Sequence, residues 1–486
     1  MKILVVASEA VPFAKTGGLG DVVGALPRAL ARVGHHVKVF IPRYKTLSLG
    51  YYQTRLLDWN SAVEIDSRKL PLSIECVRER KSPLEHYFVR NDSLFSRSQF
   101  YVDDRTGADY PDNDDRFIFF TRAVLNTVKH LDWRPDVIHV HDWQAALIPA
   151  YLRLMLQDEP FFTGVKTVLT IHNLAFQGTF EADRFKSIGL PESHFYPTGP
   201  FEFYGKSNFL KAGIIYADKI TTVSRRYAEE IQSSEMGCGL DGVLRQRSDD
   251  LIGIVNGVDY SVWSPSRDKK IPYTYYPANL SGKRMNKVEL LNRLGLPVRD
   301  GTPLIGIISR LSDQKGFDLI AEIAAAIFSM DVQMVVLGSG DAKYHELFES
   351  LEKQYPDRVK ACLKFDDDLA HWIEAGADMF LMPSRFEPCG LNQMYSLKYG
   401  TVPIVREVGG LADTVQNYDA STSEGNGFVF KDYSSGQLLA TIKRATETYR
   451  RKRVWTKIMK AGMQLDYSWD NVAGKYIELF TKLTSN

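Results

Sequence analysis

The chain has 486 residues, of which 44% are apolar and 24% are charged, and its formal net charge is +1. Because one hydrophobic core does not grow to this size, we expect two α/β domains in an ordinary globular protein. The even charge balance gives no reason to expect a nucleic-acid partner.

The first expected element is a buried strand, Lys2 to Ala7. Its apolar run is too short for a signal-peptide core, and no run approaches the ~20 apolar residues of a membrane span. We therefore expect no membrane partner, and the four cysteines, which form no disulfide framework, predict a reducing cytoplasm. A helix is predicted over Asp21 to Val33, where apolar residues recur at three-to-four spacing, followed by a strand, His36 to Ile41. This βαβ opening predicts a parallel sheet.

The loop between that strand and that helix carries Lys15-Thr16-Gly17-Gly18-Leu19-Gly20. A dinucleotide-binding fold needs Gly-x-Gly-x-x-Gly and an acidic residue ~20 positions later, and both are missing, so an NAD oxidoreductase is disfavoured. A lysine beside paired glycines at a helix N-terminus favours phosphate. The alternative is a mobile glycine hinge with a solvated lysine.

Two later strands of this half end in histidine and a polar residue. The acidic segment 103–116 is expected to be a surface loop, with a helix from Phe117 to Leu131. Strand Val137 to Val140 leads into His141-Asp142-Trp143, and strand Lys166 to Ile171 leads into His172-Asn173. Convergent polar groups at one sheet edge predict a pocket. No third ligand has metal-site spacing, so hydrogen-bonded histidines are the preferred interpretation.

The second half repeats the α/β pattern. Residues 263–284 are polar and rich in proline, which predicts a linker between domains. Strand Pro303 to Ile308 then ends at Ser309-Arg310, with Lys315 shortly after it. The four cysteines, Cys76, Cys238, Cys362 and Cys389, lie too far apart for a metal or redox motif.

The stretch from Ala377 to Val415 has the densest group of candidate site residues. A short apolar strand, Met379 to Met382, is followed by Ser384, Arg385 and Glu387. In an open parallel sheet the strand ends face the ligand crevice. A helix is expected to begin at Pro388, so that the backbone N–H groups of Cys389, Gly390 and Leu391 face a ligand.

These residue types indicate glycosyl transfer. Lys15, Arg310 and Lys315 can neutralise a departing diphosphate, and no pair of carboxylates has spacing that predicts a magnesium site. Glu387 can accept hydrogen bonds from sugar hydroxyls. We therefore expect a nucleotide-sugar substrate, with no metal and no cofactor.

The same motifs resemble those of bacterial glycogen synthases, the ADP-glucose-dependent starch synthase-type glycosyltransferases with the two-domain GT-B fold. The resemblance rests on Lys15 to Leu19, His141-Asp142-Trp143, Thr170 to Asn173, Ser309 to Gly316 and Ser384 to Leu391. It covers both domains and nearly the whole chain. It implies two Rossmann-like parallel-sheet domains that face each other across a cleft.

The resemblance also implies roles for individual residues. Glu387 would grip the donor glucose, Arg310 and Lys315 would stabilise released ADP, and the backbone carbonyl of His172 would help a cationic transition state at the anomeric centre. Asp142 belongs to the same catalytic set. The remaining implied substrate-binding residues are Lys15, Gly17, Gly18, Asp21, Asn256, Phe365, Cys389, Gly390 and Leu391. Phe365 stands where many relatives have a tyrosine that is expected to stack on adenine.

The resemblance implies a retaining, metal-independent transfer of glucose from ADP-glucose to the non-reducing end of glycogen or another α-1,4-glucan. The expected domains are 1–258 on the acceptor side, 259–465 for the nucleotide sugar, and a C-terminal helix, 466–486, that packs back towards the first domain. UDP-glucose as the donor, a nucleotide-sugar epimerase, a pyridoxal-phosphate phosphorylase and a non-catalytic glucan-binding protein are the alternatives.

Overall fold

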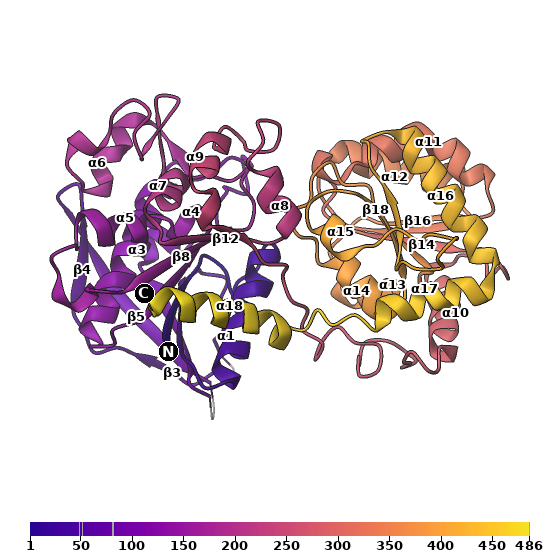
Figure 1. The fold of residues 1–486 in the computed structure, drawn as a ribbon, viewed down its shortest axis with the longest axis horizontal. Helices are drawn as coiled ribbons and strands as arrows, with labels where there is room; N and C mark the ends of the chain where they lie inside the picture. Colours follow the sequence, from indigo (N-terminus) through magenta and orange to yellow (C-terminus); the bar gives the residue numbers. More distant parts are fainter. Residues whose placement is uncertain (48, 51, 80–81, 486) are drawn as a thin grey trace. The chain divides into compact units, whose positions relative to one another are not determined.

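The computed structural model describes residues 1–47, 49–50, 52–79 and 82–485. The chain forms two compact units (Figure 1). Unit 1 comprises Met1–Gly257 and Trp469–Asn486, and unit 2 comprises Val258–Ser468. Within the described ranges, no helix is both long and apolar enough to cross a lipid bilayer.

Unit 1 is built on a ten-stranded sheet with the order β13-β12-β8-β7-β1-β2-β6-β5-β3, in which β4 also pairs with β5. Pairs that involve β3, β4 or β5 are antiparallel, and all the others are parallel. The bounds are β1 Lys2–Val6, β2 His36–Pro42, β3 Thr54–Leu56, β4 Ser61–Ile65, β5 Arg68–Arg78, β6 Leu84–Arg90, β7 Val137–His141, β8 Lys166–Ile171, β12 Lys219–Thr222 and β13 Leu251–Gly253. The strand order reverses between β1 and β7, so a ligand crevice is expected at their carboxyl ends.

The helices of unit 1 cover this sheet. Their bounds are α1 Gly18–Arg32, α2 Asp92–Phe95, α3 Asn113–His130, α4 Asp142–Ala145, α5 Leu147–Leu154, α6 Phe185–Ile188, α7 Phe209–Tyr216, α8 Arg225–Glu230, α9 Asp241–Gln246 and α18 Trp469–Thr484. The prediction of a surface loop over 103–116 is wrong at its C-terminal end, because α3 already begins at Asn113. Asp114 and Asp115 are buried and form salt bridges with Arg184.

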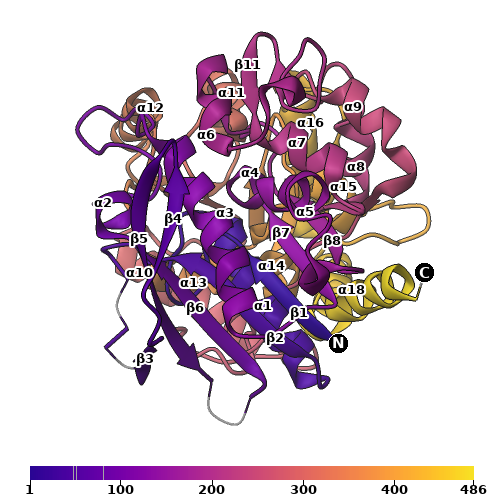
Figure 2. The same cartoon turned by 90° about the vertical axis from the view of Figure 1, so that its left-hand side faces the viewer.

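The C-terminal helix α18 belongs to unit 1, beside α1 and the N-terminus (Figures 1 and 2). Tyr476 and Phe480 are fully buried, and their rings lie 5.4 and 5.6 Å from the ring of His139. Arg32 at the end of α1 donates to Asp470 over 2.6 Å. A segment more than two hundred residues away in the sequence therefore completes the core of this unit.

The aromatic region after β8 contains a small antiparallel sheet of order β10-β11-β9. Its strands are β9 Thr179–Phe180, β10 Glu202–Phe203 and β11 Lys206–Asn208. Phe180 and Phe209 pack together with centroids 4.8 Å apart, and Trp143 lies 5.7 Å from Phe180. Much of the aromatic content here therefore serves packing.

Unit 2 contains a six-stranded, fully parallel sheet with the order β16-β15-β14-β17-β18-β19. The bounds are β14 Leu304–Ile308, β15 Gln333–Leu337, β16 Val359–Cys362, β17 Met379–Met382, β18 Val402–Arg406 and β19 Phe428–Phe430. This is the doubly wound order 3-2-1-4-5-6, whose reversal lies between β14 and β17. The predicted α/β class with two parallel-sheet domains is confirmed.

The helices of unit 2 are α10 Ser281–Leu294, α11 Phe317–Ser329, α12 Ala342–Gln354, α13 Asp367–Gly376, α14 Asn392–Tyr399, α15 Gly409–Thr414, α16 Ser435–Arg450 and α17 Lys452–Met463. Segment 263–284 is not a loose linker. Tyr275 is 2% exposed and donates to the carbonyl of Tyr399 over 2.8 Å, and α10 begins at Ser281. The proline and serine content of this segment therefore reflects irregular but packed backbone.

Candidate active site

The central feature of unit 2 is an ion pair between Lys315 and Glu387, with the lysine Nζ 2.5 Å from Oε2 of the carboxylate. Lys315 ends a short 3-10 helix, Asp313–Lys315, that follows β14, and Glu387 follows β17. These two strands are neighbours, and they flank the reversal of strand order. The pair therefore lies where a doubly wound sheet binds its ligand.

Backbone hydrogen bonds hold the two loops together. The N–H of Arg385 donates to the carbonyl of Gln314 over 2.8 Å, and the side-chain amide of Gln314 donates to the carbonyl of Phe386 over 3.2 Å. Gly316 adopts a positive φ of +73°, and a Cβ there would lie 2.0 Å from the carbonyl oxygen of Pro383. The close approach requires glycine, and it fixes the position of Lys315.

Glu387 is only 6% exposed. Besides Lys315, the Ser384 hydroxyl donates to Oε2 over 3.0 Å. The backbone of Gly409, at the start of α15, also packs closely against Glu387, since a Cβ on Gly409 would meet the Glu387 carbonyl oxygen at 1.9 Å. The carboxylate is thus held in one orientation by its neighbours, as an acceptor for sugar hydroxyls must be.

The helix that was expected to begin at Pro388 begins four residues later, since α14 starts at Asn392. Cys389 is buried, and Gly390 takes a positive φ of +69°, so the segment before the helix is a tight bend. Across the described chain, the N–H groups of Gly390 and Leu391 donate to no protein acceptor. They remain available to a ligand in front of the helix.

Two other predicted residues of unit 2 are exposed. Arg310 follows β14 directly and forms no salt bridge with any described residue. Phe365 is 85% exposed, because it lies three residues beyond the end of β16 at Cys362. Both residues follow carboxyl ends of strands of the same parallel sheet, and the structure shows no contact between either of them and Glu387 among its described side chains.

In unit 1, a buried glutamate that the sequence analysis missed organises the loop after β1. Glu9 accepts the N–H of Thr16 over 2.6 Å and the N–H of Gly17 over 3.3 Å. The hydroxyl of Tyr101 donates to the same carboxylate over 2.7 Å. The backbone N–H groups of Thr16 and Gly17 are therefore occupied. A phosphate at this loop would instead meet the first N–H groups of α1, at Gly18 and Leu19, which donate to no acceptor in the described chain.

Lys15 and Asp21 form a salt bridge of 2.7 Å, with half of the lysine side chain exposed. Asp21 lies in the first turn of α1, where a carboxylate interacts favourably with the helix dipole. The structure therefore brings the predicted residues Lys15, Gly17, Gly18 and Asp21 together at one helix N-terminus.

The strand-end histidines form a buried group. His141 Nδ1 lies 3.0 Å from His172 Nε2, and His139 Nε2 lies 2.6 Å from the hydroxyl of Thr170. Burial lowers the pKa of His139 and of His172 to about 3, so both rings are neutral at physiological pH. The interpretation as hydrogen-bonded histidines is confirmed, and among the described residues no group of three or more His, Cys, Asp or Glu side chains could hold a metal ion.

Asp142 starts α4 in a left-handed conformation, with φ +53°. Its Oδ1 accepts the backbone N–H of His172 over 2.7 Å, which ties the end of β7 to the end of β8. Burial raises the pKa of Asp142 to about 7, and the nearby Glu9 adds to the rise. Asn256 follows β13 and is 4% exposed, and its Oδ1 has no hydrogen-bond partner among the described residues.

Comparison with known proteins identifies the family. A model described as the starch synthase catalytic domain matches residues 2–246, and one described as glycosyl transferases group 1 matches residues 292–461. The glycogen synthases of Pseudothermotoga lettingae and Thermotoga maritima are 45% and 46% identical to the chain, over 99% of it and over 98% and 99% of their own lengths. The chain belongs to the glycogen synthase family.

Solved structures agree with this assignment to the glycogen synthase family. The catalytic domain of starch synthase IV from Arabidopsis thaliana, bound to ADP and acarbose, superposes with a TM-score of 0.91 at 33% identity, over 100% of this chain and 99% of that one. A sucrose-phosphate synthase from Thermosynechococcus elongatus has a TM-score of 0.61 at 17% identity, which shows the fold alone. The resemblance drawn from the motifs is confirmed, and this member of the glycogen synthase family is a hexosyltransferase with the GT-B fold.

Proposed function

We propose that this chain lengthens an α-1,4-glucan by transferring glucose from ADP-glucose to its non-reducing end, with retention at the anomeric carbon. One observation carries the proposal. A cation and a buried carboxylate, Lys315 and Glu387, are held together at the strand-order reversal of unit 2 in a chain of the glycogen synthase family.

The chemistry of unit 2 fits a nucleoside diphosphate sugar. Lys315 and Arg310 would neutralise the negative charge that develops on the departing diphosphate, and a charge-assisted hydrogen bond is stronger than a neutral one. The N–H groups of Gly390 and Leu391 supply further donors for phosphate or sugar oxygens. Glu387 would accept hydrogen bonds from glucose hydroxyls, and Cys389 shapes the bend between them.

The residues of unit 1 are proposed to serve the same reaction. Lys15, Gly17, Gly18 and Asp21 would bind the donor at the start of α1. The backbone carbonyl of His172 would stabilise positive charge at the anomeric carbon. Asp142 would fix that carbonyl, since it holds the N–H of His172. Asn256 would supply its unpartnered amide oxygen to a ligand hydroxyl.

The nucleotide preference is proposed from Phe365 and from a relative. A ring that is 85% exposed beside a phosphate-binding edge is available to stack on a base. The starch synthase IV structure was solved with ADP, which supports adenine over uracil. None of the four cysteines, all of which lie in the described ranges, forms a disulfide, which fits a reducing cytoplasm as the compartment of the activity.

The experiment is a donor comparison. Purified protein is incubated with glycogen primer, excess EDTA, and ADP-glucose or UDP-glucose, and nucleotide release and chain length are measured. We expect ADP release with primer extension, undiminished by the chelator. Faster release from UDP-glucose would overturn the donor assignment. Glucan affinity without nucleotide release from either donor would favour the non-catalytic glucan-binding alternative.

A further inference from the structure

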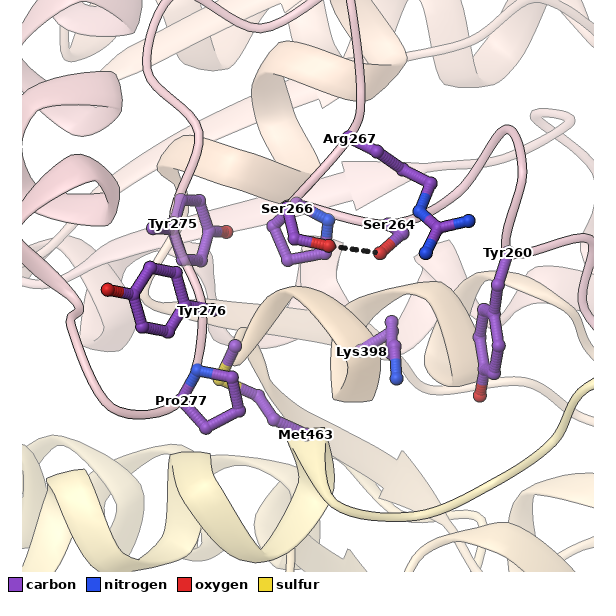
Figure 3. Close-up of a pocket in the computed structure, with 10 residues that line it drawn as sticks. Tyr260, Ser264, Ser266, Arg267, Tyr275, Tyr276, Pro277, Lys398 and Met463 are labelled. Atoms are coloured by element: carbon purple, nitrogen blue, oxygen red, sulfur yellow. Dashed lines mark hydrogen bonds between the residues drawn. The ribbon is translucent and has the colours of Figure 1, made fainter.

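A second candidate site lies in unit 2, in a cavity of about 220 Å³ between the segment that follows Val258 and helices α14 and α17 (Figure 3). It is lined by Tyr260, Ser264, Arg267, Tyr276, Lys398 and Met463, among others. None of these residues belongs to the predicted active site. Ligand binding at this cavity would not require the proposed activity.

Two cations, Arg267 and Lys398, line this cavity. Within the described part of the chain, neither Arg267 nor Lys398 forms a salt bridge, and no side-chain hydrogen bond of either one is present. Burial lowers the pKa of Lys398, the negative charge of Asp466 acts in the opposite direction, and the positive charge of Arg267 has a smaller lowering effect. Two like charges near one another in a partly desolvated pocket repel, and a bound anion would relieve the repulsion.

The carboxylate closest to Arg267 in the sequence does not serve the pocket. Asp268 is turned inward, where its Oδ2 lies 2.7 Å from His371 Nδ1 and accepts the hydroxyl of Tyr399 over 2.6 Å. Its side chain is 2% exposed. Lys398 also lies in the last turn of α14, where a cation suits the helix dipole, but that explanation does not extend to Arg267.

The rest of the lining is suited to a small polar organic group. Ser264 and Ser266 place their hydroxyls 3.2 Å apart on the same side as Arg267 (Figure 3). The Tyr260 ring lies 4.3 Å from Lys398 Nζ, and Tyr276 is 53% exposed at the rim. Hydroxyls between tyrosine rings are typical of carbohydrate-binding surfaces. The cavity lies below the ~300–1,000 Å³ of ordinary ligand pockets, which favours a ligand smaller than a nucleoside diphosphate sugar.

We propose that this cavity binds a sugar monophosphate, with the phosphate on Arg267 and Lys398 and the sugar hydroxyls on the two serines. The site is separate from the proposed donor site. Leu391 and Lys398 lie near opposite ends of α14, an eight-residue helix of about 12 Å. A ligand in this cavity therefore leaves Glu387 and Lys315 accessible.

The test is isothermal titration calorimetry on the full chain, with saturating ADP present to occupy the proposed donor site. Fructose 6-phosphate, fructose and inorganic phosphate are titrated separately at one ionic strength, because salt screens such contacts. We expect fructose 6-phosphate to bind at least ~10-fold more tightly than phosphate, and fructose to give no measurable heat.

Variants of the two cations test whether the heat of fructose 6-phosphate binding comes from this cavity. Arg267→Gln removes an exposed charge without altering packing, and it should weaken fructose 6-phosphate binding at least ~10-fold, as should Lys398→Gln. Lys269→Gln is the matched control, because Lys269 is an exposed lysine of the same segment outside the cavity lining, and it should bind like the wild type. Circular dichroism verifies that each variant is folded.

The proposal is overturned by no binding of fructose 6-phosphate, by equal affinity for inorganic phosphate, or by unchanged affinity in folded Arg267→Gln. Failure of the glucosyltransferase assignment would appear in the donor comparison above, not in these titrations. The two outcomes are therefore distinguishable.

Discussion

At the scale of single residues, the account depends on charged groups whose partners are far away in the sequence. Lys315 and Glu387 are separated by 72 positions, yet they make one of the shorter salt bridges of unit 2. A partly buried pair of this kind costs desolvation energy, and it adds little net stability compared with well-packed apolar residues. Its retention at a strand-order reversal therefore favours a role in binding.

Glu387→Gln tests the carboxylate. The amide keeps the shape but weakens hydrogen bonding to sugar hydroxyls, so we expect kcat for glucan extension to fall about 100-fold, the loss typical of one transition-state contact. The matched control is Glu407→Gln, because Glu407 faces Lys431 at 3.9 Å in an exposed pair elsewhere in unit 2. Steady-state kinetics with folding monitored by circular dichroism would show the difference. Equal rates in the two variants would remove Glu387 from the site.

The raised pKa of Asp142 predicts that the stability of the protein depends on pH. Burial raises its folded-state pKa to about 7, whereas an unfolded aspartate titrates near ~3.9. Between these values the folded state keeps a proton that the unfolded state has lost, so this residue makes stability fall as pH rises from about 4 to about 7.

Asp142→Asn removes that proton equilibrium and keeps an oxygen for the N–H of His172. Its free energy of unfolding relative to wild type should therefore be higher at pH 8 than at pH 5, by up to about 3 kcal/mol, because about two of the three pKa units lie above pH 5. Differential scanning calorimetry at both pH values measures this. Exposed Asp58→Asn is the control and should show no such change. A wild-type-to-variant difference that is the same at both pH values would contradict the raised pKa.

At the scale of elements, close backbone contacts position the site loops. The start of α15 lies against the backbone of Glu387, and Gly409 adopts φ +45° with no room for a Cβ. Gly409→Ala should displace the Glu387 loop, with a cost of about 1–3 kcal/mol and a loss of most activity.

The control for that substitution is Gly436→Ala in α16. A Cβ at Gly436 would have its nearest neighbour at 3.7 Å, and alanine favours helix more than glycine does. Thermal unfolding and ADP-release assays should show a stable, active Gly436→Ala and a destabilised, inactive Gly409→Ala. A fully active Gly409→Ala would show that the loop tolerates displacement.

Strands built on short apolar runs were predictable from sequence with their observed bounds, as β8 and β17 show. Helix starts were harder to predict. Pro388 is typical of a first helical turn, but the positive φ of Gly390 delays α14 to Asn392. The basic segment 443–457 is likewise divided between two helices, since α16 ends at Arg450 and α17 starts at Lys452. Such boundaries depend on tertiary packing that local patterns do not contain.

The candidate site was predictable only in part, because its contacts also depend on tertiary structure. Charged residues directly after apolar strands, such as Arg310, carry a clear signal. Glu9 gave the same signal after β1, but it lies in a long loop and was overlooked. Its bonds to Thr16 and Gly17 depend on how that loop folds back. The hydrogen bonds of Gln314 with Arg385 and Phe386 likewise require the sheet order, which a single sequence does not show.

At the scale of the whole molecule, the chain closes unit 1 with its last helix. Phe480→Ala in α18 removes a fully buried ring beside His139, and we expect a loss of about 3–5 kcal/mol. Chemical denaturation followed by fluorescence measures the change. Lys475→Ala, on the exposed side of the same helix, is the control. Equal stability of the two variants would show that α18 contributes little to the core of unit 1.

The central claim concerns the diphosphate of the donor, which Lys315 is proposed to bind. The most direct measurement is the calorimetric Kd of ADP for wild type, Lys315→Ala and Lys343→Ala, where Lys343 forms an exposed ion pair with Asp313 in the same unit. The account predicts that Lys315→Ala raises the Kd at least ~10-fold while Lys343→Ala leaves it unchanged. An ADP affinity that is the same in folded Lys315→Ala and in wild type would contradict it.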